Sequence, residues 1–408
     1  MAKAKTPSAA DVSAATPQVS ATPPQAPATS QVPQVPDTEL LREPAEVKYR
    51  RELEALRQNE SDQAPAAWKL SPRSVLAYIT GAKKPLKATI DGKVVEVTIT
   101  RKFFGDDSIV ERSIVTLASE RALLLVGDPG TGKSWLSEHL AAAIGGTSAH
   151  IVQGTAGTSE EHIKYSWNYA LLLAEGPSER ALVASPVLRA MREGTTARFE
   201  EITRTAPEIQ DALISVLSEK QVAIPELGEL VAAQRGFNLI ATANTRDRGV
   251  NEMSSALKRR FNFVTVPVVD DLEQEIRIVT RREAELRGDH EVGVAAPAEL
   301  AALLVQVFQE LRAGVTKDGK TRLRSPSGAL STAEAISVLF GSGILAQHFG
   351  DGEVTAADLA RSLTGTVGRE DAADLDAVRE YGETVAKGRG GAWDAFHAAV
   401  KRELGGRG

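Results

Sequence analysis

The chain has 408 residues, a formal net charge of −6 and a hydrophobic content of 42%, as in a soluble protein of two or three domains. It contains no cysteine, which excludes disulfides, thiolate metal sites and cysteine nucleophiles. The acidic balance gives no general electrostatic reason to hold nucleic acid, and no run approaches the ~20 apolar residues of a membrane helix.

Residues 1–37 are rich in proline and alanine and carry almost no large apolar side chains. Such a segment cannot bury enough surface to offset chain entropy, so we expect a disordered tail. It also lacks the apolar stretch of a signal peptide, and we therefore expect a cytoplasmic protein.

Residues 38–102 predict a small N-terminal α+β module. Tyr49, Leu53 and Leu56 share one face of a first helix, and a second short helix begins near Pro72. The pair Asp91-Gly92 separates two β-prone runs, which is a strong hairpin signal. A helix from about Ile109 to Glu120 then leads into the next strand.

The apolar run Ala122–Val126 is followed by a glycine-rich loop and then by a helical pattern through Ile144. This order of strand, loop and helix is the setting of a phosphate-binding P-loop. Lys133 is expected to neutralise the β- and γ-phosphates of ATP, and Ser134 to offer its hydroxyl to Mg²⁺. The predicted cofactor-binding loop comprises Gly127, Asp128, Pro129, Gly130, Thr131, Gly132, Lys133 and Ser134.

Two adjacent carboxylates follow at Glu200 and Glu201, before an amphipathic helix predicted over residues 208–220. In a nucleotide hydrolase, a carboxylate at the end of a strand beside the P-loop orients the Mg²⁺ shell, and its neighbour polarises the attacking water. We assign the first role to Glu200 and the second to Glu201.

A further apolar run ends at Asn244, which places an amide where it could hold the lytic water or touch the γ-phosphate. Arg259 and Arg260 precede Phe261 and a strand rich in valine and proline. A permanently charged, bidentate guanidinium suits the phosphate charge of a transition state, so both arginines are catalytic candidates.

Helical periodicity dominates after Val269. Leu300, Leu304 and Phe308 belong to one apolar stripe, and Ser331 with Glu334 forms a capping box that opens another helix. We expect a helical domain over residues 269–370 and a helical tail over residues 371–408.

These motifs, in this order and at these separations, resemble the AAA+ ATPases, and in particular the MoxR branch. Further matches to that branch lie at Pro186–Gly194, Glu201–Arg204 and Ser218–Val222, and the resemblance covers residues 103–365. It implies an α/β fold, in which a P-loop AAA+ core over residues 103–268, with a parallel sheet flanked by helices, is followed by an all-α lid.

The resemblance also implies roles. Lys133 and Ser134 match the Walker A pair, Glu201 the catalytic glutamate, Asn244 the sensor 1 residue, and Arg260 the finger that acts on a neighbouring subunit's ATP. Such ATPases are usually hexameric rings. The sequence departs from the family twice, since Glu200 stands where an aspartate is usual and Arg324 replaces the usual sensor 2 motif.

Three function classes follow. The first is a MoxR-like ATPase that remodels or matures client proteins, with insertion of a cofactor or metal, typically beside a von Willebrand A-domain partner. The second is a ring motor of another system, such as gas-vesicle assembly, metal chelation or a nucleic-acid-linked system, although the acidic chain argues against nucleic acid. The third is a scaffold that binds ATP with little turnover, which Glu200 in place of aspartate leaves open.

Overall fold

The computed structural model describes residues 41–119, 121–244, 251–326, 330–367 and 372–405. The tail predicted over residues 1–37 lies outside this part of the chain. Residues Glu43–Gly408 form one compact unit, which contains three hydrophobic clusters of described residues. Within these ranges, no helix combines the length and apolar character needed to cross a membrane.

The N-terminal module has the predicted helices and hairpin. Ser71 caps the third helix by accepting a hydrogen bond from Ser74 N, and Pro72 occupies its first turn. The hairpin turns at Asp91 and Gly92, both with positive φ, as a two-residue turn requires. The elements are α1 (Ala45–Lys48), α2 (Arg50–Gln58), α3 (Pro72–Thr80), β1 (Leu86–Ile90) and β2 (Lys93–Val97).

The buried side chains of the described part of this module pack together with those of the α/β core. Leu53 and Tyr78 belong to the same buried cluster as Leu123, Leu136 and Val264 of the α/β core. The helix α4 (Asp107–Ala118) joins them through its buried face. One face of the central sheet is thus covered partly by residues that precede the predicted core.

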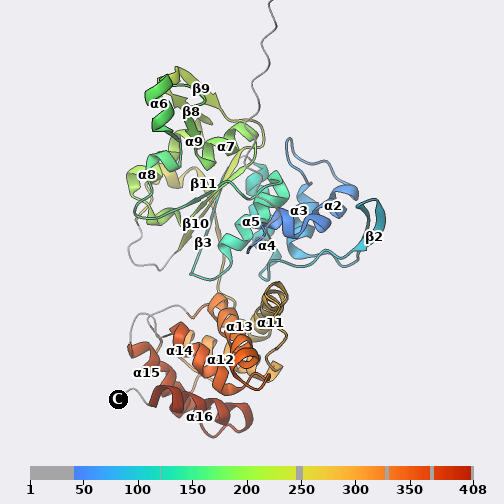
Figure 1. The fold of residues 1–408 in the computed structure, drawn as a ribbon, viewed down its shortest axis with the longest axis vertical. Coiled ribbons are helices and arrows are strands. Elements are labelled where there is room, and N and C mark those ends of the chain that lie inside the picture. Colours follow the sequence, from blue (N-terminus) through green and yellow to red (C-terminus); the bar gives the residue numbers. More distant parts are fainter. Residues whose placement is uncertain (1–40, 120, 245–250, 327–329, 368–371, 406–408) are drawn as a thin grey trace, which may run out of the picture. The chain divides into compact units, whose positions relative to one another are not determined.

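The central sheet has five parallel strands in the order β11-β3-β10-β7-β4 (Figure 1). Its strands are β3 (Ala122–Gly127), β4 (Ile151–Gln153), β7 (Thr196–Glu200), β10 (Asn238–Asn244) and β11 (Phe261–Thr265). Nearly every residue of β3, β7 and β10 is buried, as expected for parallel strands covered on both faces. Since β3 lies between β10 and β11, the P-loop sits at the carboxyl edge of the sheet, beside Asn244.

Two antiparallel hairpins and several short helices surround this sheet. One hairpin pairs β5 (Tyr165–Trp167) with β6 (Leu182–Ala184), and the other pairs β8 (Gln221–Ile224) with β9 (Glu229–Ala232). The remaining elements are α5 (Lys133–Gly145), η1 (Glu160–His162), α6 (Tyr169–Glu175), α7 (Pro186–Glu193), η2 (Ile202–Arg204), η3 (Pro225–Leu227) and α10 (Ser255–Lys258).

The helix predicted over residues 208–220 differs from the prediction. It is interrupted at Ala212, which divides it into α8 (Pro207–Asp211) and α9 (Leu213–Ser218). It also ends two residues early, because Lys220 adopts a left-handed backbone with φ +54° that leads the chain into β8.

In the described residues after Val269, every named element is helical (Figure 1), and an isolated bridge joins Val315 to Arg322. Its elements are α11 (Leu272–Asp289), α12 (Ala298–Ala313), α13 (Thr332–Phe349), α14 (Ala356–Val367), α15 (Ala372–Tyr381), a π-helical turn η4 (Gly382–Ala386) and α16 (Gly391–Gly405). The predicted capping box is present, since Ser331 and Glu334 exchange hydrogen bonds at the start of α13.

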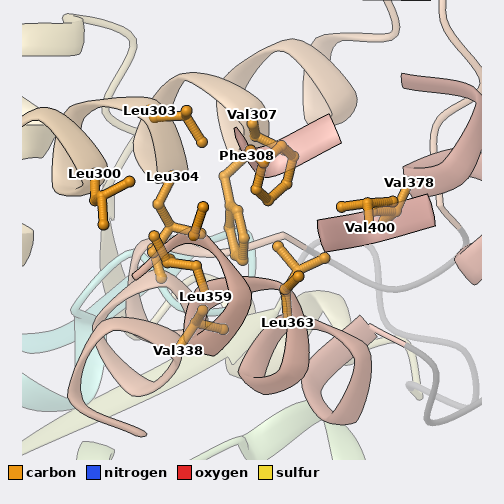
Figure 2. Close-up of a cluster of buried hydrophobic side chains, with 14 of the residues drawn as sticks. Leu300, Leu303, Leu304, Val307, Phe308, Val338, Leu359, Leu363, Val378 and Val400 are labelled. Atoms are coloured by element: carbon orange, nitrogen blue, oxygen red, sulfur yellow. The ribbon is translucent and has the colours of Figure 1, made fainter. Parts of the chain in front are cut away.

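Described helices before and after the expected boundary at residues 370 and 371 contribute side chains to one hydrophobic cluster. Figure 2 shows Phe308 and its α12 neighbours packed with side chains of the other lid helices, among them Val378 of α15 and Val400 of α16. The last helices are therefore part of the lid, because they bury apolar faces that α12 and α14 alone would leave exposed.

A substitution in α16 tests this. Phe396 is fully buried, so replacing it with alanine is expected to lower the free energy of unfolding by about 3–5 kcal/mol, through lost burial and an unfilled cavity. Urea unfolding followed by circular dichroism measures the change. Phe349→Ala is the control, because Phe349 is 77% exposed, and its effect should stay within about 0.5 kcal/mol. Equally small effects of both substitutions would restore the detachable tail.

Candidate functional site

The P-loop between β3 and α5 has a backbone that only glycine accommodates at several positions. A Cβ at Gly127 would lie 2.3 Å from the carbonyl oxygen of Val266, and one at Gly130 would lie 2.2 Å from Ser331 Cβ. Gly130 and Gly132 also have φ values of +75° and +85°. The loop therefore leaves its N–H groups accessible at the start of a 13-residue helix, which favours an anion.

Lys133 closes this loop from its own first helical turn. Its Nζ donates to the carbonyl oxygens of Gly127 at 3.0 Å and Asp128 at 2.7 Å. The residue is only 6% exposed, so the ammonium is held along the inside of the loop. A cation in this position suits the phosphate chain of a nucleotide.

Glu200 at the end of β7 is the centre of a hydrogen-bond network. Its Oε2 accepts from Ser134 Oγ at 2.6 Å and from Thr242 Oγ1 at 2.8 Å. Its Oε1 lies 2.5 Å from Ser137 Oγ and 2.9 Å from the guanidinium of Arg198. The two groups predicted to share one Mg²⁺ are thus in direct contact, and their hard oxygen atoms fit that ion.

Glu201 follows in a left-handed conformation with φ +55°, which is uncommon for a residue with a side chain. Its N–H donates to Thr242 Oγ1 at 2.9 Å, and its Oε2 accepts from Arg204 Nη1 at 2.9 Å. Asn244 lies on the neighbouring strand, where it pairs in register with Gly127. The carboxylate and the amide therefore lie on the same side of the P-loop, at the ends of the adjacent strands β7 and β10.

A cavity of about 520 Å³ joins these groups. Glu201 and Asn244 line it together with most of the predicted loop, namely Pro129, Gly130, Thr131, Gly132, Lys133 and Ser134. Its apolar wall can receive a flat base and comprises Phe103, Phe104, Trp135, Val268, Ile278 and Ile336. A lining that combines hydrogen-bond donors with apolar side chains fits a nucleotide.

Lys102 also lines this cavity, but its ammonium is engaged elsewhere. Burial lowers the pKa of Lys102 to about 8, although the carboxylate of Glu52, 2.6 Å away, favours the charged form. The Lys102 side chain is 1% exposed and also donates to the carbonyl oxygens of Tyr78 and Thr100. We therefore assign Lys102 to the packing of the N-terminal module and not to nucleotide binding.

Three predicted arginines lie away from this cavity, and Gly127, Asp128 and Glu200 do not line it although they adjoin or contact residues that do. Arg259 is exposed, and Arg260 donates to Ser218 Oγ and, at 2.5 Å, to the carbonyl oxygen of Ala256. Arg324 lines a different cavity, with charged residues of α15, η4 and α16. From α13, the residues that line the nucleotide-sized cavity are Thr332, Ala333 and Ile336.

Three residues that contact Glu200 were not among the predicted site residues. Arg198 is a charged residue inside a buried strand, two positions before Glu200, and the alternation of a strand places both on one face. Ser137 follows Ser134 by three residues and therefore lies on the same face of α5. Thr242 is a polar residue within the apolar run of β10. Each of these signals is present in the sequence.

Two family models match the chain. The AAA domain of the dynein-related subfamily matches residues 122–261, and the YehL-like AAA+ ATPase C-terminal domain matches residues 273–397. These matches confirm the resemblance to AAA+ ATPases, whereas the descriptions name the dynein-related and YehL-like groups and not the MoxR branch.

The chain is also similar to individual proteins. The uncharacterized protein YehL of Escherichia coli (strain K12) is 43% identical over 367 residues, which cover 89% of this chain and 98% of YehL. The uncharacterized protein SH1500 of Staphylococcus haemolyticus is 30% identical over 45% of this chain and 69% of that protein. Among solved structures, NtrX from Brucella abortus in complex with ADP is 14% identical, with a TM-score of 0.43 and coverage of 74% of this chain and 66% of that chain.

Proposed function

Because this chain belongs to the YehL-like family of AAA+ ATPases, we propose that it hydrolyses Mg²⁺-bound ATP in a ring of identical subunits and uses the turnover to remodel a client protein. The proposal is supported by the fact that some of the predicted residues share one cavity and the two predicted finger arginines lie outside it. The P-loop, Glu201 and Asn244 share one cavity, and Arg259 and Arg260 do not line it.

The residues of the cavity have separate tasks in this proposal. Lys133 binds the phosphates, and Ser134 with Glu200 would hold the Mg²⁺, which would supply positive charge to the phosphate oxygens. Glu201 orients and polarises the attacking water, because its carboxylate borders the cavity beside the P-loop. Asn244 fixes the position of the water or of the γ-phosphate from the adjacent strand.

The ring in this proposal supplies the arginine finger. Phosphoryl transfer gains much of its rate from a guanidinium at the γ-phosphate, and neither Arg259 nor Arg260 of the same chain lines this cavity. Arg282 does line it, but its guanidinium lies 4.0 Å from the centre of the Trp135 ring and pairs with Glu285. A neighbouring subunit that presents Arg260 would complete the site, and a closed hexamer provides one such contact for every subunit. A MoxR-like chaperone role with a von Willebrand A-domain partner is the form of client remodelling that the motifs favour.

The contact between Glu200 and Ser134 favours turnover over the passive scaffold. The longer side chain of glutamate still reaches the hydroxyl of Ser134 at 2.6 Å. The departure from aspartate therefore leaves the pair of oxygen donors intact.

A trapped complex tests the client. Tagged Glu201→Gln is expected to bind ATP without hydrolysing it, so that partners bound in the ATP state co-purify and are identified by mass spectrometry. Lys133→Ala is the control without nucleotide. An A-domain protein or a metalloenzyme subunit that depends on ATP supports the remodelling function. Recovery of nucleic acid, or of nothing that depends on nucleotide, contradicts it and favours the ring motor or the scaffold.

A further inference from the structure

A buried arginine lies against the carboxylate of the Mg²⁺ site. Arg198 and Glu200 point to the same face of β7, and their side chains are 7% and 4% exposed. The guanidinium Nη2 donates to Glu200 Oε1 at 2.9 Å. A charge so far removed from water is stable only when it is paired and hydrogen-bonded. Arg198 and Glu200 both meet this condition.

Arg198 is also fixed by contacts to the P-loop helix and to the loop before β4. Its Nε donates to Ser137 Oγ at 3.0 Å, its Nη2 to the carbonyl oxygen of Ser134 at 3.1 Å, and its Nη1 to the carbonyl oxygen of Ser148 at 3.3 Å. The planar fork of arginine makes these contacts from one rigid group, which the single ammonium of lysine could not reproduce. The guanidinium is therefore held in place beside Ser134.

These contacts give the two oxygen atoms of Glu200 different surroundings. Oε1 is occupied by Arg198 and Ser137, whereas Oε2 faces Ser134 Oγ and Thr242 Oγ1. The carboxylate thus presents one oxygen to the proposed metal position, and its negative charge is balanced within the protein. A neutral pair attracts a free divalent cation much less than a lone carboxylate does.

We propose that Arg198 is a positioning residue that neutralises and orients Glu200, so that the divalent cation enters the site together with the nucleotide phosphates and not before them. This inference rests on the proposed Mg²⁺–ATP site. The proposal also explains why position 200 is a glutamate and not an aspartate, since the longer side chain reaches Ser134 and Arg198 at the same time.

A double-mutant cycle tests the proposal without relying on turnover. The variants are Arg198→Met, Glu200→Gln and the two combined. The first measurement is the affinity for a fluorescent ATP analogue in EDTA, with no divalent cation present. Glu200→Gln leaves the buried cation unbalanced near the phosphates and is expected to tighten this affinity about tenfold, whereas Arg198→Met is expected to weaken it about tenfold. The combined variant should return near the wild-type affinity.

The second measurement is Mn²⁺ binding to the nucleotide-free protein, followed by electron paramagnetic resonance. Arg198→Met exposes the carboxylate to the ion and is expected to bind Mn²⁺ at least tenfold tighter than wild type, and Glu200→Gln in the same chain should abolish the gain. Arg198→Lys keeps the charge, so it should not bind Mn²⁺ without nucleotide. The exposed Arg189→Met is the control and should behave as wild type in both measurements.

The outcomes separate the possibilities. Unchanged metal and ATP affinities in a folded Arg198→Met, or a combined variant that binds Mn²⁺ as tightly as Arg198→Met alone, would overturn the proposal. If Arg198→Met does not fold, tighter ATP binding by Glu200→Gln in EDTA still supports the proposal. An ATP affinity of Glu200→Gln equal to that of the wild type would overturn the proposal. A wild-type protein that binds no ATP at all contradicts the proposed function itself, which is a different result.

Discussion

Replacing Glu201 with glutamine is expected to lower ATP turnover at least ~100-fold while ATP affinity stays close to that of the wild type. The amide keeps the size of the side chain but cannot take a proton from the attacking water. The contacts that bind ATP come from the P-loop, which the substitution leaves in place. Steady-state phosphate release gives the turnover, and titration calorimetry gives the affinity.

Glu208→Gln is the matched control for this variant. Glu208 is exposed, lies seven residues further along the chain and does not line the cavity. Its substitution should change neither quantity. Turnover of Glu201→Gln within a factor of three of the wild type would show that another group activates the water.

Replacing Arg260 with alanine is expected to lower turnover at least ~10³-fold, because a guanidinium at the transferred phosphate contributes that much in related phosphoryl transfers. The loss should appear with intact nucleotide binding, since Arg260 does not line the cavity of its own chain. Turnover per subunit in the wild type should rise with protein concentration as rings form. Lys258→Ala, two residues before Arg260 and partly exposed, serves as the neutral control.

Mixing two inactive variants distinguishes a shared site from a site within one chain. Lys133→Ala lacks the phosphate cation, and Arg260→Ala lacks the finger. In rings assembled from equal amounts of both, about a quarter of the interfaces join an intact Lys133 to an intact Arg260, and activity should return to that level. If mixed rings recover no activity, the finger acts within the subunit that binds the ATP. If Arg259→Ala loses turnover and Arg260→Ala does not, Arg259 is the finger.

Local features of the sequence determined much of the fold. The P-loop, the Asp91-Gly92 hairpin and the capping box at Ser331 each depend on residues that are close together in the chain. Backbone preferences and nearby hydrogen bonds decide such elements before any distant contact forms. The parallel sheet and the helical lid were also predictable, because their apolar periodicities are long and regular.

Only the tertiary structure decided which distant residues meet. The strand order β11-β3-β10-β7-β4 brings Thr242 to Glu200 and places Arg198 against α5. The same holds for Arg324, which the sequence suggested for the nucleotide site and the structure places in another cavity. These pairings depend on the packing of elements that are far apart in the chain. Local periodicity of the sequence contains no information about that packing.

The sequence by itself therefore determined the order of the candidate groups, namely a P-loop, two carboxylates and an amide. The tertiary structure decided how that chemistry is balanced, through the buried contact of Arg198 with Glu200 and through the separation of Arg260 from the cavity. The physical reason is that residue types fix which groups can bind or ionise, whereas charge balance depends on distances of a few ångströms that only the packed chain defines.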